Sequence, residues 1–377
     1  MNGVENMDDS EEKLNGALTA EEVMELIDGA SGEVGEVSRE LQPQRDFILD
    51  KTSTLDERLE VYEDIIDSQV GDTTLMRARN IEREVGIRQI FLKFEGSNPS
   101  GTQKDRIAFK QAMDALRRGY EAITVATCGN YGVAIALATS LAGLRCIIFI
   151  PENYHTSRIK EMTDMGAEIR RTPGDYEKAV EISGEFARKE DYYDANPGGC
   201  NTALQLKGYG QISYEIYDEL RDAPYAVACP VSNGTTLAGI YKGFLSLFRR
   251  GKTSHMPRIV AGSSYRKNPI VNAHLNHLDS CADLQANKIK ESKINEPLIN
   301  WHSIDGDFVL EALRETNGWA GYATDKKMMT FAKLIREREG LSVVPASTAG
   351  LIALVEKHKK ESLPNDRYVV VLTGRKS

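Results

Sequence analysis

Residues 90–127 read IFLKFEGSNPSGTQKDRIAFKQAMDALRRGYEAITVAT, and this stretch predicts the fold class. Two short runs rich in β-branched and aromatic residues, 90–94 and 122–127, are typical of buried strands. Between them, residues 106–119 carry apolar side chains at helical spacing and end in a glycine, which favours a helix with a left-handed C-terminal cap. A strand, a helix and a second strand in this order predict a unit in which the two strands run parallel.

The same alternation continues along the chain. A second helix is predicted over 132–144, directly after the strand at 122–127. Further strands are predicted at 145–151, 225–231, 258–264 and 368–374. Strands that alternate with helices predict an α/β protein with open parallel sheets. Because 377 residues exceed one average domain, we expect two domains.

Composition narrows the class of protein. The chain is 41% hydrophobic, has no apolar run long enough to cross a membrane, and begins with an acidic segment that is unlike a signal peptide. Its five cysteines form no CxxC pair, as in proteins of a reducing compartment. We therefore expect a cytoplasmic protein. His274 and His277 have no accompanying cysteine or carboxylate pattern, so no metal site is predicted.

The net charge of −9 is unevenly distributed. Residues 1–40 hold twelve acidic and two basic side chains, whereas the rest of the chain has 44 acidic and 45 basic ones. This balance argues against nucleic acid or an anionic membrane as a partner. We interpret residues 1–60 as an acidic N-terminal extension, with a capping-box helix signal at Thr19–Glu22.

A turn-rich segment, SNPSGTQKDR (97–106), places Lys104 between the strand at 90–94 and the following helix. A lysine that is partly desolvated near a helix N-terminus has a lowered pKa and attacks aldehydes. A solvated surface lysine is the alternative interpretation. The segment by itself does not decide between them.

A second segment, TCGNYG, follows the strand at 122–127 and opens the next helix. Free backbone N–H groups at a helix start suit a carboxylate or a ring oxygen. Asn130 adds both a donor and an acceptor. A tight packing turn is the alternative. The candidate ligand-binding residues of this loop are Thr127, Cys128, Gly129, Asn130 and Tyr131.

Two further segments follow predicted strands. The loop SNGTT comprises Ser232, Asn233, Gly234, Thr235 and Thr236, whose N–H and hydroxyl groups suit a dianionic phosphate. Thr373 lies at the end of the strand at 368–374 and offers a neutral hydrogen-bond partner to a heterocyclic nitrogen. Loops at the carboxyl ends of parallel strands meet in one crevice, where α/β sheets bind their ligands.

Together these segments give the chain a resemblance to a known family. Over about residues 70–377 it resembles the fold-type-II pyridoxal-phosphate enzymes of the tryptophan-synthase-β superfamily, and within it most of all the threonine synthases. The matching stretches, in family order, are GDTTL (71–75), FLKFEGSNPSGTQKDR (91–106), TVATCGNYG (124–132), DANP (194–197), PVSNGTTLAGIYKGF (230–244), YATDKK (322–327), PASTAGL (345–351) and VVLTG (370–374).

The resemblance implies a role for each candidate residue. Lys104 would form a Schiff base with pyridoxal 5'-phosphate and later move protons, and Asn130 would bind the cofactor's ring oxygen. The loop from Thr127 to Tyr131 would hold the substrate carboxylate, and the loop from Ser232 to Thr236 the cofactor phosphate. Thr373 would meet the pyridine nitrogen. Because a neutral hydroxyl leaves that nitrogen unprotonated, elimination and replacement would be favoured over transamination.

The resemblance also implies an architecture. Residues 61–113 and 205–377 would form a large cofactor-binding domain, and residues 114–204 a small mobile domain that closes over the site. The enzyme would be a homodimer acting on a small amino-acid substrate.

The reaction is left open among several classes. A threonine-synthase-like enzyme would convert phosphohomoserine and water to threonine and phosphate. The alternatives are a β-replacement enzyme of the cysteine or cysteate synthase kind, a serine/threonine dehydratase, or a catalytically silent homologue. Gln103 stands where threonine synthases usually carry an aromatic residue, and Tyr131 where they carry a small one. A second phosphate would need a further basic pocket, for which Arg106, Lys207 and Arg266 are candidates.

Overall fold

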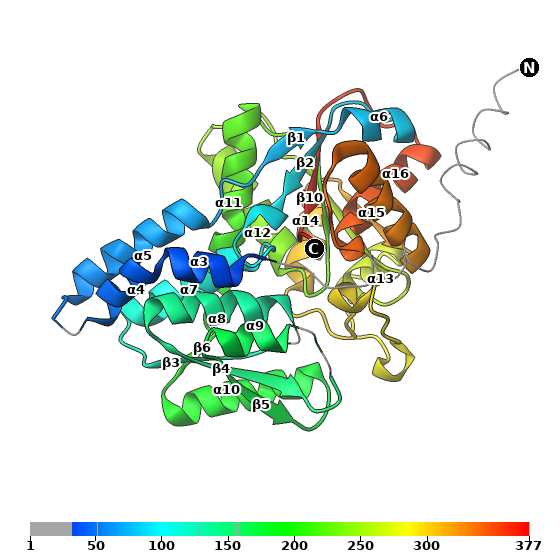
Figure 1. The fold of residues 1–377 in the computed structure, drawn as a ribbon. Coiled ribbons are helices and arrows are strands. Elements are labelled where there is room, and N and C mark those ends of the chain that lie inside the picture. Colours follow the sequence, from blue (N-terminus) through cyan, green and yellow to red (C-terminus); the bar gives the residue numbers. More distant parts are fainter. Residues whose placement is uncertain (1–31, 51, 128, 155, 157, 377) are drawn as a thin grey trace, which may run out of the picture.

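Two separate β-sheets organise the protein. The computed structural model describes residues 32–376, except 51, 128, 155 and 157 (Figure 1). One sheet has six strands in the order β1-β2-β10-β7-β8-β9, and the other has four in the order β5-β4-β3-β6. Only the pair of the edge strand β1 with β2 is antiparallel, and every other strand pair within these two sheets is parallel. The predicted α/β class with two open parallel sheets is confirmed.

Every predicted strand is present, with its bounds within two residues of the prediction. The six-stranded sheet consists of β1 (Leu75–Arg77), β2 (Ile90–Phe94), β7 (Ala226–Pro230), β8 (Arg258–Ser264), β9 (Trp319–Ala323) and β10 (Tyr368–Leu372). The four-stranded sheet consists of β3 (Ala122–Ala126), β4 (Arg145–Pro151), β5 (Glu168–Thr172) and β6 (Tyr193–Asp194). The sequence does not predict β1, β5, β6 or β9. Strands β1 and β6 are too short to carry a pattern. Strand β5 is a largely polar edge strand, and β9 contains small residues between its aromatic ones.

Helices cover both sheets. In chain order they are α3 (Val34–Glu40), α4 (Gln42–Leu49), α5 (Leu55–Gln69), α6 (Arg79–Val85), α7 (Asp105–Arg117), α8 (Asn130–Ala142), α9 (Ile159–Asp164), α10 (Tyr176–Glu190), α11 (Thr202–Leu220), α12 (Thr235–Arg249), α13 (Pro269–Leu275), α14 (Gly306–Glu315), α15 (Asp325–Glu339) and α16 (Ala349–Lys360). The predicted glycine caps are present, because Gly119 follows α7 at φ 78° and Gly143 caps α8 at φ 70°.

The N-terminal helices α3 and α4 pack against α8, at the left of Figure 1. Val34, Val37, Leu41 and Ile48 of these helices are buried. This packing is possible because α8 is apolar on every side, as expected for a helix enclosed by other elements. The capping-box signal at Thr19–Glu22 lies outside the described residues.

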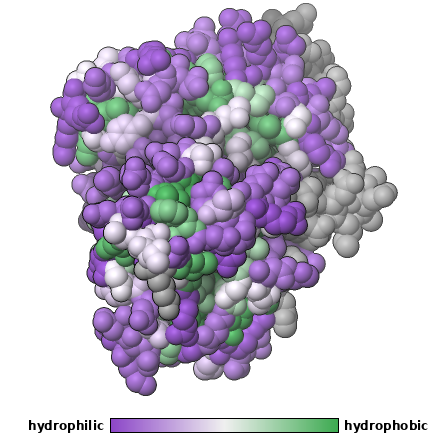
Figure 2. Space-filling view, turned by 60° about the vertical axis from the view of Figure 1, so that its left-hand side comes forward, coloured by the Kyte–Doolittle hydropathy of each residue, from purple (hydrophilic) through white to green (hydrophobic). Residues whose placement is uncertain are grey.

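One face of the molecule is mainly polar (Figure 2). On the face drawn in Figure 2, hydrophilic side chains predominate, and apolar atoms are exposed in small groups. Among the helices of the described residues, none is long and apolar enough to span a membrane.

Helices α11 and α12 pack in very close contact through glycines. A Cβ atom on Gly243 of α12 would lie 2.5 Å from the carbonyl oxygen of Gly210 and 2.7 Å from Ser213 Oγ in α11. A carbonyl in the helix backbone cannot move aside without shifting the whole helix. The glycine therefore sets the distance between the two helices.

We predict that Gly243→Ala lowers the free energy of unfolding by about 1–3 kcal/mol, because overpacking forces the backbone apart. Chemical denaturation monitored by circular dichroism measures this change. The matched control is Gly35→Ala in α3, where an added Cβ meets nothing within 4 Å. That variant should be neutral or slightly more stable. Equal stability of the two variants would contradict the prediction.

Candidate active site

The loop that carries Lys104 is attached to the C-terminal end of β10. Gln103 N donates to the carbonyl oxygen of Thr373 over 3.1 Å, and Arg375 N donates to that of Gly101 over 2.7 Å. Because β10 pairs in parallel with β2, both strands end at the same edge of the sheet. This pairing brings two sequence-predicted residues, Lys104 and Thr373, into neighbouring positions although they are far apart in the chain.

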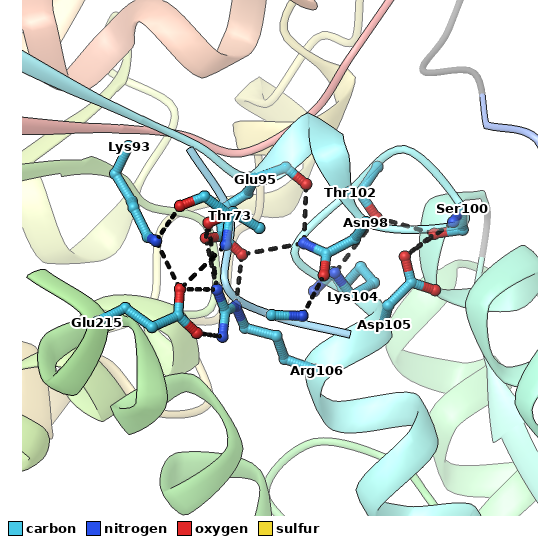
Figure 3. Close-up of polar contacts among 11 residues, drawn as sticks. Thr73, Lys93, Glu95, Asn98, Ser100, Thr102, Lys104, Asp105, Arg106 and Glu215 are labelled. Atoms are coloured by element: carbon cyan, nitrogen blue, oxygen red, sulfur yellow. Dashed lines mark hydrogen bonds and ion pairs between the residues drawn. The ribbon is translucent and has the colours of Figure 1, made fainter. Parts of the chain in front are cut away.

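Hydrogen bonds within the loop hold its shape (Figure 3). Asp105 Oδ2 accepts from the backbone N–H of Ser100 over 2.9 Å and from its hydroxyl over 2.8 Å. Thr102 Oγ1 accepts from the backbone N–H of Lys104 over 3.2 Å. Lys104 therefore precedes the first turn of α7 in a fixed backbone position.

The Lys104 amine lies between aromatic rings. Its Nζ is 5.7 Å from the ring centroid of Tyr131 and 6.0 Å from that of Tyr209. Burial among these rings lowers the pKa of Lys104 to about 8. Among the described residues, none forms a hydrogen bond or ion pair with Nζ that would hold the charge in place. The amine is therefore poised to act as a nucleophile or a base near neutral pH.

The asparagine loop follows β3 and begins α8. Thr127 is buried, and its Oγ1 accepts from the backbone N–H of Gly129 over 3.4 Å. Asn130 is the first residue of α8, and its Oδ1 accepts from Arg158 Nη1 over 3.0 Å. The first N–H groups of a helix have no partner within it, so they are available to an anion. Cys128 lies outside the described residues.

Tyr131 presents its ring, not its hydroxyl, to the lysine. The hydroxyl donates to the carbonyl oxygen of Ala195 over 2.9 Å and accepts from Gln111 Nε2. It is therefore engaged away from Lys104. The ring, which is buried, limits the access of water to the amine.

The loop Ser232–Thr236 follows β7 and begins α12, as predicted. Gly234 caps the helix at φ 95°, and a Cβ atom there would lie 2.9 Å from Val309 Cγ2, so only glycine fits. The carbonyl oxygen of Ser232 accepts from Asn268 Nδ2 over 3.0 Å. Asn233 Oδ1 accepts from Asn300 Nδ2 over 3.0 Å.

The two threonines of this loop are in different environments. The hydroxyl of Thr235 donates to Asp305 Oδ2 over 2.5 Å, so only its backbone N–H is free for an anion. The side chain of Thr236 contacts the hydroxyl of Tyr209, whose ring faces Lys104. Tyr209 thus connects the Ser232–Thr236 loop to Lys104.

Thr373 lies beside a second hydroxyl. Its Oγ1 is 3.1 Å from Ser347 Oγ, which also accepts from the backbone N–H of Gly374 over 3.1 Å. Ser347 is fully buried in the short helix Pro345–Thr348. Ser347 lies in the stretch 345–351, which resembles the family, but nothing in the sequence marks this serine as a site residue. A neutral pair of hydroxyls therefore stands at the position predicted to meet a ring nitrogen.

Arg106, the first candidate for a second basic pocket, is engaged elsewhere (Figure 3). It is buried and forms ion pairs with Glu95 over 2.6 Å and with Glu215 over 2.6 Å. Lys93 also pairs with Glu215. Although burial opposes its charge, these basic partners lower the pKa of Glu215 to about 2. Arg106 is therefore a structural residue and is not free for a substrate.

The other two candidates, Lys207 and Arg266, are exposed. Arg266 lies over the ring of Tyr265, with its guanidinium carbon 5.2 Å from the centroid.

Sequence reasoning missed Arg158 and Tyr209, because an isolated arginine in a polar loop and a tyrosine within a helix carry no recognisable motif. Tertiary packing brings Arg158 to Asn130 and Tyr209 to Lys104.

Comparison with known proteins identifies the family. A family profile described as "Pyridoxal-phosphate dependent enzyme" matches residues 66–374. Threonine synthase of Methanocaldococcus jannaschii is 27% identical over 305 residues, which cover 80% of this chain and 74% of that protein. Threonine synthase of Halalkalibacterium halodurans is 28% identical over 306 residues, covering 81% of this chain and 82% of that protein.

Solved structures share the fold at low identity. Maize serine racemase superposes with a TM-score of 0.70 at 18% identity, covering 85% of this chain and 92% of that one. Threonine deaminase isoform 2 of Solanum lycopersicum gives a TM-score of 0.68 at 16% identity, covering 86% and 91%. The chain belongs to the pyridoxal-phosphate dependent enzymes of fold type II, most resembles threonine synthases, and uses pyridoxal 5'-phosphate as its cofactor.

Proposed function

We propose that this enzyme performs elimination or replacement at the β or γ carbon of an amino acid, with Lys104 as the residue that carries the cofactor. The observation that carries the proposal is the position of Lys104. Its desolvated amine lies where the asparagine loop, the Ser232–Thr236 loop and the end of β10 meet. A surface lysine would have neither these neighbours nor a pKa of about 8.

The residues fit pyridoxal phosphate. Backbone N–H groups at Gly234 and the start of α12 suit a dianionic phosphate, and only glycine allows this turn, because a Cβ atom there would clash with Val309 and Asp305. The buried hydroxyl of Tyr209 has no hydrogen-bond partner of good geometry among the described residues, so it is available to a ligand. Asn130 would bind the ring oxygen, and Thr373 with Ser347 the pyridine nitrogen.

Each residue then has a chemical task. When bound, the cofactor supplies an electron sink next to the substrate's Cα. Lys104 Nζ removes and returns the proton at that carbon, which its lowered pKa permits near neutral pH. The loop Thr127–Tyr131 orients the substrate carboxylate through N–H groups of α8. The rings of Tyr131 and Tyr209 exclude water from the amine.

Neutral hydroxyls at the pyridine position favour this class of reaction. Thr373 Oγ1 has Ser347 Oγ as its side-chain neighbour, and neither is an acid that would protonate a ring nitrogen. An unprotonated nitrogen limits the charge drawn into the ring. Elimination and replacement are therefore favoured over transamination.

We further propose that residues 114–204 form a small domain that closes over the site. Two hydrogen bonds support a closed arrangement. Tyr154 of the small-sheet region donates to Glu296 Oε1 over 2.7 Å, and Arg158 Nη2 donates to the carbonyl oxygen of Ser100 over 3.1 Å. Closure of this kind sequesters the reaction from water. Homodimerisation and a cytoplasmic location stay predictions from the sequence.

The specific reaction we propose is that of threonine synthase, in which phosphohomoserine and water give threonine and phosphate. The similarity to threonine synthases over four fifths of the chain supports it. The alternatives are β-replacement of the cysteine synthase kind and serine or threonine dehydration. The folds of a threonine deaminase and a cysteine synthase resemble this one, so the fold does not separate these reactions.

Turnover assays of the holoenzyme decide among these reactions. We expect phosphohomoserine to release phosphate and threonine in equal amounts, whereas phosphoserine, O-acetylserine and threonine react more slowly. Lys104→Ala is the control for background hydrolysis. Turnover of another substrate without phosphate release from phosphohomoserine would move the assignment to that reaction. A protein without the visible absorbance of bound cofactor, and without turnover, would be a silent homologue.

A further inference from the structure

Arg158 is a buried arginine outside the segments that the sequence singled out. It precedes α9, and its side chain is only 4% exposed. Its guanidinium forms ion pairs with both carboxylate oxygens of Glu161 over 2.8 Å. The two remaining contacts are with Asn130 Oδ1 over 3.0 Å and with the carbonyl oxygen of Ser100 over 3.1 Å. Arg158 therefore joins the asparagine loop to the lysine loop.

The contact with Asn130 has a chemical consequence. A carboxamide offers an oxygen that accepts and a nitrogen that donates, whereas a guanidinium can only donate. The contact can form only with Oδ1, because the reverse orientation would place two donors against each other. Arg158 therefore fixes the rotation of the Asn130 side chain. Nδ2, which has no hydrogen-bond acceptor among the described residues, is left as the free donor.

The contact with Ser100 adds a geometrical consequence. The backbone N–H and the hydroxyl of Ser100 both donate to Asp105, the residue next to Lys104. Arg158 is bonded to the other side of the same residue, through its carbonyl oxygen. The Arg158 side chain thus controls the orientation of Asn130 and the distance between Asn130 and the start of α7.

We propose that Arg158 is a positioning residue, which holds Asn130 Nδ2 as the donor to the cofactor's ring oxygen. The inference rests on the proposed role of Asn130. A donor to that oxygen stabilises its anionic form, and this form sets the balance between the long-wavelength and short-wavelength absorbance bands of the bound cofactor. Arg158 does not need to touch the cofactor for this effect.

The test compares five holoenzyme variants by absorbance and by cofactor affinity. We expect Arg158→Met to shift absorbance toward the short-wavelength band and to weaken cofactor binding about tenfold to a hundredfold, as for loss of a charge-assisted hydrogen bond. Asn130→Ala should give the same shift. The double variant should be no worse than Asn130→Ala, because both changes remove the same donor.

Lys160→Met is the matched control. Lys160 is a cation in α9, two residues after Arg158, but it is exposed and pairs with Asp164, so the absorbance bands and cofactor affinity of this variant should match the wild type. Arg158→Lys keeps the charge but not the fork of donors, and it should give an intermediate shift. If Arg158→Met does not fold, as judged by circular dichroism, the lysine variant provides the same comparison.

The outcomes separate the two proposals. A wild-type spectrum and affinity in the Arg158 variants, with a shift in Asn130→Ala, would overturn the role of Arg158 only. Additive losses in the double variant would also overturn it, because Arg158 would then act independently of Asn130. An unchanged spectrum in Asn130→Ala would overturn the proposed role of Asn130, and the inference with it.

Discussion

Lys104→Ala is expected to abolish the visible absorbance of bound cofactor and to lower turnover by at least about a thousandfold, the contribution expected of a positioned catalytic base. The physical reason is that among the residues of the structure only Lys104 presents an amine between the rings of Tyr131 and Tyr209. Absorbance, mass spectrometry after borohydride reduction, and steady-state kinetics measure the effect.

Lys110→Ala is the control for this variant, because Lys110 lies in α7, the helix that Lys104 precedes, and is not a residue of the proposed site. It should keep both absorbance and turnover near the wild type. A reduced, cofactor-labelled peptide that contains a lysine other than Lys104 would contradict the assignment.

The pH dependence of cofactor capture tests the same lysine in another way. Because burial lowers the pKa of Lys104 to about 8, the uncharged and nucleophilic amine increases as the pH rises through 8 and then reaches a plateau. The rate at which the apoenzyme binds pyridoxal phosphate should follow this curve. A rate that keeps rising to the ordinary lysine range near 10.5 would show that the amine is solvated.

The second large effect is expected on stability. Arg106→Met should lower the free energy of unfolding by about 3–5 kcal/mol, because Glu95 and Glu215 would keep charges without this partner in a buried site (Figure 3). Equilibrium unfolding in denaturant measures the loss. Glu95 is fully buried, so water cannot replace the guanidinium.

Arg77→Met is the matched control for this change. Arg77 forms an ion pair with Glu82 over 2.8 Å, but its side chain is 40% exposed. An exposed pair contributes at most about 1 kcal/mol. A loss of less than 1 kcal/mol in Arg106→Met would show that the buried network does not stabilise the lysine loop.

Several features of the fold follow from local patterns in the sequence. The apolar runs at 90–94 and 145–151 predict β2 and β4, because buried parallel strands are apolar on both faces. The glycines after α7 and α8 predict the helix ends through their left-handed conformation. By contrast, β5 and β9 were not predictable, since both are edge strands without a continuous apolar run and each depends on its one neighbouring strand for its pairing.

The candidate site divides in the same way. The sequence by itself determined which loops follow strands, and hence that Lys104, Asn130, the Ser232–Thr236 loop and Thr373 each follow the carboxyl end of a strand. Tertiary structure alone decided that the Lys104 amine lies against the rings of Tyr131 and Tyr209, that Arg106 is engaged by Glu95 and Glu215, and that Arg158 reaches Asn130. Burial and charge pairing arise between residues that are distant in the chain, so no local pattern encodes them.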